Sequence, residues 1–328
     1  MTKVTLTVDT EEEWKWASGY SRSPGGLTNI YDGVPLFHEF CMSLGLKVTY
    51  FTNFSVLRDN HASSILQSLA KDDCTEIGLH IHPWNTPPFD DNQSDYPFHS
   101  FLHNLSPELA VAKLNTIFDL FFTKGINPTS YRGGRYSTSR QIQEYLASRG
   151  VIADASILPF TGWHDPGAPN FFHRDNCPVR RDFGSRGSFI WEIPLTLSFT
   201  RGPERFWARF FQSASRRPWS SFRFIGICEK MVCRRVWVNL ENPLTEGLPK
   251  LLKVLRARNL PHINITLHSS SLVVGKSPYV TSLQELDRLK SRLLRCVEVF
   301  SHWSDYTPST ITEVANNLER EYHARPRN

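Results

Sequence analysis

The 328-residue sequence lacks the features that mark several classes of protein. It has no apolar run near the ~20 residues that a membrane-spanning helix needs. Its hydrophobic content of 40% is too high for a wholly disordered chain. Its six cysteines include no C-x-x-C pair, which argues against a structural zinc site and a disulfide framework. No basic and apolar leader precedes the first strand pattern, so we expect a cytoplasmic protein.

Positive and negative side chains nearly balance along the chain, except in one segment. The chain carries +5 in total, which is too weak to indicate nucleic-acid binding. Residues 201–235 hold nine Lys and Arg against Glu204 and Glu229, so this segment carries +7 and the remainder carries −2. Phe and Trp residues are interspersed with its arginines. The segment predicts either an amphipathic helix with solvated arginines or a docking surface for an anionic substrate carrier or an anionic membrane face.

Short apolar runs alternate with helical patterns along most of the chain. We expect strands at residues 4–8, 47–51, 76–80, 129–132, 152–154, 189–193 and 263–267. We expect helices at residues 35–44, 63–70, 106–122, 139–148, 247–258 and 282–299. This alternation predicts a single α/β domain with a parallel sheet and a site at the C-terminal ends of its strands. The Pro-, Asp- and Asn-rich residues 83–105 predict a long functional loop over those ends.

Titratable side chains lie at the predicted strand ends, namely Asp9, His80, Arg132, Asp154 and His268. Asp9-Thr-Glu11 could supply a metal ligand and a base, or belong to a solvated acidic loop. His80-Ile-His82 could bind one metal if the backbone turns at His80, or be a pair of structural histidines. Arg132, followed by two glycines, could hold a carboxylate in a bidentate pair, or mark a plain strand-to-turn junction.

Three weaker patterns complete the set of candidates. His268 follows an apolar strand, where a histidine is either a general acid or base or a structural residue. The serines after it suggest nucleophilic catalysis, but no G-x-S-x-G elbow is present, and we discount a serine hydrolase. His99 and His103 have helical metal-pair spacing, but no helix signal surrounds them, so we do not expect them to be ligands.

Taken in order, five segments resemble the motifs of the polysaccharide deacetylases, the NodB-homology domain of carbohydrate esterase family 4. They are Asp9-Thr-Glu11, His80-Ile-His82-Pro-Trp84, Tyr131-Arg132-Gly-Gly-Arg135-Tyr136, Asp154-Ala-Ser156 and Leu267-His268. Further stretches after residues 191 and 266 are similar to a subgroup associated with bacterial surface-polysaccharide (O-antigen or capsule) and lipopolysaccharide biosynthesis. The resemblance spans residues 1–315, with an insertion at about 200–236 and a C-terminal tail at 316–328.

The resemblance implies a distorted (β/α)7 barrel that hydrolyses an N-acetyl group on an amino sugar, either in a polysaccharide or in a nucleotide- or lipid-diphosphate-linked precursor. It implies a general base, Asp9, oriented by Arg132, and a general acid, His268, tuned by Asp154. It implies a divalent metal, Zn²⁺, held by Glu11, His80 and His82. Substrate or oxyanion contacts are implied for Arg135, through its backbone amide, and for Tyr136 and Trp84.

The sequence departs from the family pattern at the metal motifs. The family places its two histidines four residues apart, but the fourth residue after His80 is Trp84, and His82 is the nearest substitute. Glu11 stands where aspartate is more common. Two alternatives therefore stay open: a metal-independent hydrolase of another C–N amide bond, and a non-catalytic glycan-binding protein on the same barrel.

Overall fold

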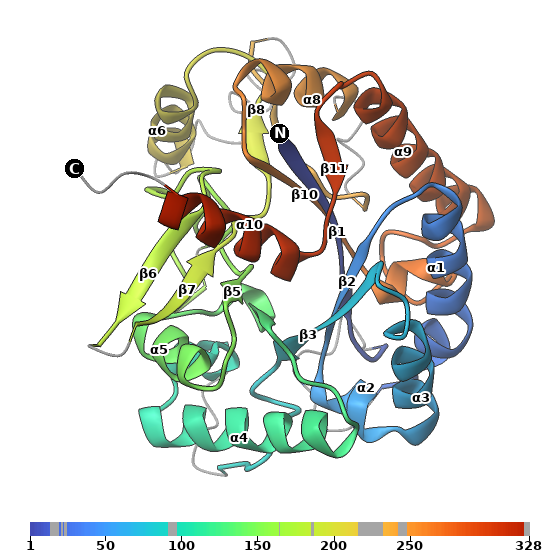
Figure 1. The fold of residues 1–328 in the computed structure, drawn as a ribbon, viewed down its shortest axis with the longest axis vertical. Helices are drawn as coiled ribbons and strands as arrows, with labels where there is room; N and C mark the ends of the chain where they lie inside the picture. Colours follow the sequence, from blue (N-terminus) through green and yellow to red (C-terminus); the bar gives the residue numbers. More distant parts are fainter. Residues whose placement is uncertain are drawn as a thin grey trace.

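The computed structural model shows one curled sheet surrounded by helices (Figure 1). It describes residues 1–13, 20, 22, 25–90, 97–163, 165–184, 187–215, 232–241 and 248–324. The main sheet runs in the order β10 (His262–His268), β1 (Thr2–Thr10), β2 (Val48–Thr52), β3 (Thr75–Ile81), β4 (Ser130–Gly133), β5 (Ala153–Asp154), β7 (Ser188–Glu192) and β6 (Val179–Phe183). Its neighbours are parallel except for the antiparallel pair of β6 and β7.

Two further strands bridge the opening between β10 and β5. β8 (Leu197–Phe199) and β9 (Arg235–Trp237) form an antiparallel pair. The segment after β9 lies parallel to β10 through Asn239 and Thr266, and the segment before β8 bonds to the chain after β5, with the Leu195 amide 2.8 Å from the Ile157 carbonyl oxygen. The sheet thereby curls into the predicted distorted (β/α)7 barrel.

Helices connect the strands on the outside of the barrel (Figure 1). They are α1 (Val34–Ser43), α2 (Phe54–Arg58), α3 (Asn60–Leu69), α4 (Pro107–Thr123), α5 (Arg140–Ser148), α6 (Glu204–Ser215), α8 (Leu248–Ala257), α9 (Leu283–Ser301) and α10 (Ile311–Ala324). Short helical turns occur at Asn29–Gly33, Phe98–Ser100, Leu102–Asn104, Gly134–Tyr136 and Ser269–Leu272. All seven predicted strands and all six predicted helices are present, with bounds that differ by at most three residues.

The signals that start and stop these helices are visible at α4. The Ser106 hydroxyl accepts a hydrogen bond from the Leu109 amide at 3.2 Å, and Pro107 occupies the first turn, where no intrahelical N–H partner is needed. Gly125 follows the last turn with φ of 68°, a conformation that glycine adopts without the cost a Cβ imposes. Local sequence therefore sets both ends of this helix.

The alternation of β1 separates an apolar outside from a polar barrel interior. Val4, Leu6 and Val8 pack in the hydrophobic cluster between the sheet and its helices. Thr5 and Thr7 point inward instead, where their hydroxyls lie 2.9 Å from His262 Nε2 and 2.8 Å from Asn264 Oδ1. Thr5 and Thr7 are thus hydrogen-bonded inside the barrel. The next residue of β1 on the same side is Asp9.

The C-terminal part covers the end of the barrel at which the strands begin. β11 (Tyr306–Pro308) pairs with the start of β1, and α10 follows it across this end (Figure 1). The Ile311 amide donates to Thr49 on β2, and the Thr312 amide donates to Glu76 on β3. The residues from 316 onward, which the sequence analysis assigns to a tail, begin inside α10. The opposite end, where the strands finish, carries the candidate site.

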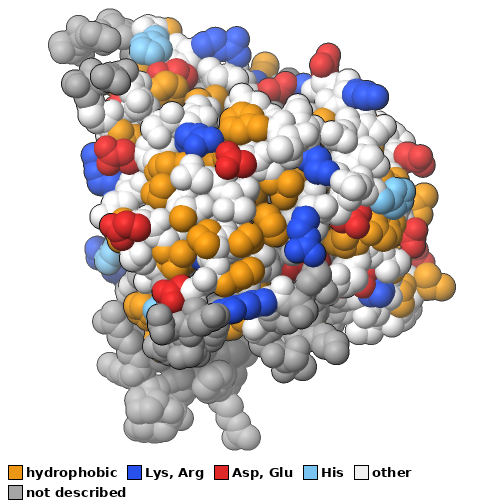
Figure 2. Space-filling view, turned by 90° about the horizontal axis from the view of Figure 1, so that it is seen from below, with side chains coloured by type: hydrophobic (Ala, Val, Ile, Leu, Met, Phe, Trp, Pro, Cys, Tyr) orange, Lys and Arg blue, Asp and Glu red, His pale blue; other side chains and the backbone are white. Residues whose placement is uncertain are grey.

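Charge is balanced on the flank of the barrel around α4. Viewed from that side, Figure 2 shows Lys and Arg side chains interspersed with Asp and Glu. This agrees with the small net charge of the chain outside residues 201–235. Within the described ranges, no helix combines the length and the apolar character that crossing a membrane requires.

One buried lysine fixes the loop that follows β3. Lys113, on α4, donates from Nζ to the carbonyl oxygens of Pro83 (2.9 Å), Thr86 (2.6 Å) and Pro88 (2.7 Å). We expect Lys113→Met to lower the free energy of unfolding by about 3 kcal/mol, because it leaves buried carbonyls without a donor. Urea denaturation measures the change. Lys71→Met, at an exposed position, is the control, and an equal effect of both variants would contradict this role for Lys113.

Candidate active site

The ends of β1, β3, β4 and β10 meet around one cavity of about 260 Å³. Two strand pairs bring the candidate residues together: Asp9 is in register with His268, and His80 with Arg132. The polar part of the cavity is lined by Asp9, Glu11, His80, His82, Arg135, Asn239 and His268. Of the strand-end candidates of the sequence analysis, Asp9, His80 and His268 therefore face a common space, whereas Arg132 and Asp154 do not line it.

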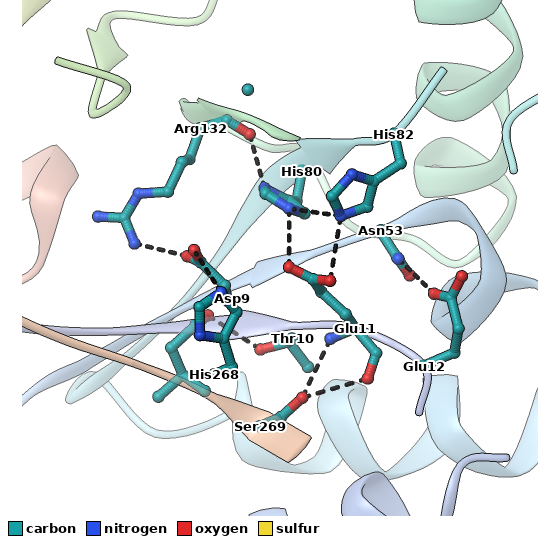
Figure 3. A network of polar contacts seen from close by, with 12 residues as sticks. Asp9, Thr10, Glu11, Glu12, Asn53, His80, His82, Arg132, His268 and Ser269 are labelled. Atoms are coloured by element: carbon teal, nitrogen blue, oxygen red, sulfur yellow. Dashed lines mark hydrogen bonds and ion pairs between the residues drawn. The ribbon is translucent and has the colours of Figure 1, made fainter. Parts of the chain in front are cut away.

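Glu11, His80 and His82 form one compact buried group (Figure 3). Glu11 Oε1 lies 3.2 Å from His80 Nε2, and Glu11 Oε2 lies 3.1 Å from His82 Nε2. The two Nε2 atoms are 3.1 Å apart. His80 and His82 share a side because β3 stays extended through Ile81, and alternate residues of a strand point the same way. The backbone turn that the sequence analysis required at His80 is absent.

The donor set fits a divalent cation. His80 Nδ1 lies 2.7 Å from the Arg132 carbonyl oxygen, which can only accept, so Nδ1 carries the hydrogen and Nε2 presents a lone pair to Glu11. An imidazole nitrogen and a carboxylate oxygen that face each other with lone pairs repel one another unless a positive charge lies between them. Bonds of about 2.0 Å to tetrahedral zinc place ligand atoms about 3.3 Å apart, close to the spacing seen here. Two imidazoles with a carboxylate are also a donor set that zinc favours.

The electrostatics of Glu11 follow from this arrangement. Burial alone would raise the pKa of the Glu11 carboxyl, but the interactions of its oxygens with His82 and His80 outweigh burial and hold this pKa well below its usual value. Glu11 is therefore a carboxylate, as a metal ligand must be.

His82 is held in place from two sides. The Trp84 ring lies 4.2 Å from the His82 ring, centroid to centroid. On the other side, Gly134 approaches so closely that a Cβ there would lie 2.3 Å from His82 Nδ1, so this position admits only glycine. Trp84 is 3% exposed and packs behind His82. Trp84 is not among the residues that line the cavity but packs on a candidate ligand, and the substrate or oxyanion contact predicted for it stays a prediction.

Arg132 holds Asp9 from inside the barrel. Its Nη1 lies 2.6 Å from Asp9 Oδ1, and the guanidinium also donates to the Thr7 hydroxyl (3.0 Å) and the Ala155 carbonyl oxygen (3.1 Å). Arg132 is fully buried and stacks on the Phe51 ring at 4.4 Å. This fixed guanidinium holds one oxygen of Asp9, while the second oxygen lies on the His268 side, 3.9 Å from His268 Nε2.

His268 pairs with Glu241, a residue that the sequence analysis missed. Its Nδ1 lies 2.8 Å from Glu241 Oε2, and its backbone amide donates to Oε1 at 3.1 Å. The other ring nitrogen, Nε2, lies 3.9 Å from Asp9 Oδ2. Burial lowers the pKa of His268, but Glu241, Glu11 and Asp9 outweigh burial and raise it to about 10. His268 is therefore a protonated donor at the edge of the cavity.

The carboxylate of Asp154 is held by groups other than His268, and the tuning role predicted for Asp154 stays a prediction. Its buried carboxylate accepts from Thr138 (2.6 Å), Gln143 (2.9 Å) and the Ser156 amide (2.9 Å). Burial raises the pKa of Asp154, while those hydrogen bonds oppose the shift. Ser156 in turn accepts from the Gly133 amide at 2.9 Å. Asp154 therefore supports the turn after β4 from outside the cavity.

Arg135 and Tyr136 line the cavity in left-handed backbone conformations, with φ of 53° and 61°. Such conformations are unfavourable for non-glycine residues and often occur at functional sites. The Arg135 guanidinium stacks on Phe101 at 4.1 Å and pairs with Asp165. Tyr136 stacks on Trp163, with the ring centroids 5.3 Å apart and the planes 12° from parallel.

The rest of the cavity wall is aromatic, from Phe101, Trp163, Trp237 and Tyr279. Flat apolar faces beside a few polar groups suit the ring of a sugar. His99 and His103 are not among the residues that line the cavity. His103 contacts the Ser137 hydroxyl at 2.7 Å and the Gly167 carbonyl oxygen at 2.9 Å, and neither histidine belongs to the groups of described residues that could hold a metal.

Comparison with known proteins identifies the fold of this chain. No family model and no curated protein matches the sequence. Among solved structures, one described as a polysaccharide deacetylase from Mycobacterium smegmatis superposes with a TM-score of 0.55 at 12% identity, over 100% of this chain and 93% of that one. Another, from Pseudomonas aeruginosa PAO1, superposes with a TM-score of 0.54 at 14% identity, over 99% and 93%. The chain has the distorted barrel fold of the polysaccharide deacetylases.

Proposed function

We propose that this protein is a metal-dependent sugar N-deacetylase that acts on an amino sugar of a bacterial surface polysaccharide or on its precursor. The observation that carries the proposal is the placement of the Glu11, His80 and His82 group beside Asp9 and His268 in one aromatic-walled cavity. The resemblance of the sequence motifs and the shared fold support the reaction. A binding protein would need no such pairing of a fixed carboxylate with a protonated histidine.

The residues suggest a division of labour for amide hydrolysis. Glu11, His80 and His82 would hold the divalent cation, Zn²⁺, whose chemistry is to lower the pKa of water and polarise the amide carbonyl. Asp9, oriented by Arg132, takes the proton from the attacking water. His268 gives its Nε2 proton to the leaving nitrogen, so that water and amide become acetate and free amine. The Arg135 backbone amide donates to the developing oxyanion.

Two measurements on the purified protein test this function. We expect elemental analysis to find one zinc per chain, and acetate release from a panel of N-acetylated nucleotide sugars and oligosaccharides to depend on it. Hydrolysis of an amide without metal would indicate the metal-independent C–N hydrolase instead. Glycan binding without hydrolysis of any member of the panel would indicate the non-catalytic binder.

A variant of His82 tests the unusual spacing of the metal motif. We expect His82→Gln to retain less than one equivalent of zinc after dialysis, because His82 Nε2 lies 3.1 Å from both Glu11 and His80. His103→Gln is the control, since its ring nitrogens contact Ser137 and Gly167 instead. Full zinc content in His82→Gln would remove His82 from the ligand set.

We propose further that the exposed face of α6 docks the anionic carrier of the substrate, a nucleotide or lipid diphosphate, or an anionic membrane. α6 buries Phe211 against Phe199 and exposes Arg205 and Arg209 one turn apart, with Phe206 60% exposed between them. The rest of the predicted basic segment, residues 216–231, lies outside the described residues.

Charge reversal on α6 tests this docking surface. We expect Arg205→Glu/Arg209→Glu to weaken binding to phosphatidylglycerol vesicles or to a diphospho-sugar severalfold at low salt, because two attractive charges become repulsive. Lys71→Glu, at an exposed position elsewhere, is the control. Binding by the parent protein that does not change between low and high salt would contradict the docking role.

A further inference from the structure

We propose that Glu12 is a positioning residue that ties the segment carrying Glu11 to the loop carrying His82, and so allows two histidines only two residues apart to share one cation with Glu11. The inference rests on the metal site of the proposed function. It assigns a task to the acidic residue that directly follows Asp9-Thr-Glu11 and that is only 5% exposed.

The carboxylate of Glu12 joins three strand ends. Its Oε1 accepts from Asn85 Nδ2 at 2.6 Å, and Asn85 belongs to the loop after β3, three residues beyond His82. Its Oε2 accepts from Asn53 Nδ2 at 2.5 Å, and Asn53 directly follows β2 (Figure 3). Glu12 itself follows Glu11 after β1. One side chain thus connects the ends of β1, β2 and β3 next to the candidate ligands.

Both asparagines are oriented by contacts at their other atoms. Asn53 Oδ1 accepts from the Val56 amide at 3.2 Å and caps α2. Asn85 Oδ1 accepts from the Thr86 hydroxyl at 3.2 Å, and its backbone amide donates to the His82 carbonyl oxygen at 3.3 Å. Each amide therefore presents its NH₂ group to Glu12. Two donors facing one side chain require an acceptor on each branch, which a carboxylate supplies and an amide does not.

His82 needs such support because it lies beyond the strand ladder. β3 ends at Ile81, whose register partner on β4 is Gly133, and no ladder pair follows. The distance of 3.1 Å between His82 Nε2 and Glu11 Oε2 therefore depends on how the two loops are held together. Groups that orient metal ligands typically change metal affinity by about 10–100-fold when removed.

Exchange of the donor and acceptor between positions 12 and 85 tests the inference. Glu12→Gln turns an NH₂ group toward Asn85, and Asn85→Asp places two carboxylates in contact. In the double variant Glu12→Gln/Asn85→Asp, the amide at position 12 keeps its oxygen for Asn53 and donates to the carboxylate at position 85, so complementarity returns with no change in total charge. Glu13→Gln is the matched control, because the neighbouring Glu13 pairs with Lys276 (2.6 Å) and the Asn29 amide (2.9 Å).

The readouts are the affinity for Zn²⁺ alone, measured by competition with a chromophoric chelator, and the visible spectrum of the Co²⁺-loaded protein. We expect each single variant to bind Zn²⁺ about 10–100-fold more weakly. We expect the double variant and Glu13→Gln to bind within about threefold of the parent protein and to keep its Co²⁺ spectrum. Asn85→Ser, which removes the side-chain amide that donates to Glu12, replaces any single variant that does not fold.

The outcomes separate this inference from the proposed function. Parent-like affinity in Glu12→Gln and Asn85→Asp would overturn the positioning role alone. A weakened double variant with a parent-like thermal transition would also overturn it, because complementarity would then have no effect on the site. Absence of Zn²⁺ binding by the parent protein would overturn the metal site itself, and the inference with it.

Discussion

Asp9→Asn is expected to lower kcat/KM for acetate release by about a hundredfold to ten-thousandfold, the range for loss of a general base. Asn has nearly the shape of Asp but cannot take a proton from water at neutral pH. Asp9 forms a second candidate group with Glu11 and His268 but is not a member of the group of Glu11, His80 and His82, so we expect this group to keep its Zn²⁺ in the variant. A loss of activity with retained zinc is therefore the expected signature of a missing base, measured by steady-state kinetics beside metal analysis.

The effect of this variant on folding needs its own measurement, because Asp9 is the counterion of the fully buried Arg132. Asn keeps an oxygen for Arg132 Nη1, so we expect a loss of about 2 kcal/mol in the free energy of unfolding rather than loss of the fold. Asp182→Asn, at a side chain 62% exposed, is the control for both readouts. Unchanged turnover in a folded Asp9→Asn protein would rule out Asp9 as the base.

The fold was predictable because its signals are local. The strands have apolar or alternating runs of ordinary length, and helices such as α4 carry their caps in the sequence. Parallel strands finish at the same end of a barrel, so polar residues after separate strands could be expected to meet. That reasoning brings Asp9, His80 and His268 to one cavity, and Arg132 into contact with Asp9, without a distance being known.

The contacts of Glu241 and Asp154 could not be predicted for a different reason, which is that they join residues remote in sequence. Glu241 directly follows the apolar run Val236–Leu240, just as Asp9 directly follows the apolar run Val4–Val8. The basic segment that precedes Val236 obscured the first of these two patterns. Asp154 also follows a strand, yet β5 pairs for only two residues and its side chain turns to Thr138 and Gln143. Strand position alone does not tell which carboxylate reaches a histidine.

Glu241→Gln is expected to lower the pKa of His268 from about 10 toward its ordinary value, because burial still lowers this pKa while the largest of the effects that raise it is removed and only Glu11 and Asp9 still raise it. At a pH two units above a pKa of 6.5, only about 1% of an imidazole is protonated. We therefore expect kcat at pH 8.5 to fall by up to about a hundredfold, with a much smaller loss near pH 6. The pH profile of kcat shows this as a shift of the alkaline limb toward lower pH.

The same pKa shift predicts how stability depends on pH. The raised pKa of His268 means that its interaction with Glu241, Asp9 and Glu11 stabilises the fold fully below about pH 6.5 and is lost as the pH rises toward 10. The metal-free protein is the proper sample, since a cation at Glu11 opposes the effect of these carboxylates on His268. NMR titration of the His268 ring and urea denaturation across this range should show the dependence in the parent protein but not in Glu241→Gln.

Asp154→Asn is the matched control, because it removes the other buried carboxylate that the sequence places after a strand and that has no contact with His268. We expect it to leave the His268 titration and the alkaline limb of the activity unchanged, whatever it costs in stability through Thr138 and Gln143. A shift of the His268 titration in Asp154→Asn but not in Glu241→Gln would show that Asp154, and not Glu241, controls the pKa of His268. The protonation of His268 is thus set by Glu241, in the segment after β9. The position of Glu241 depends in turn on how β9 and this segment pair with the rest of the barrel.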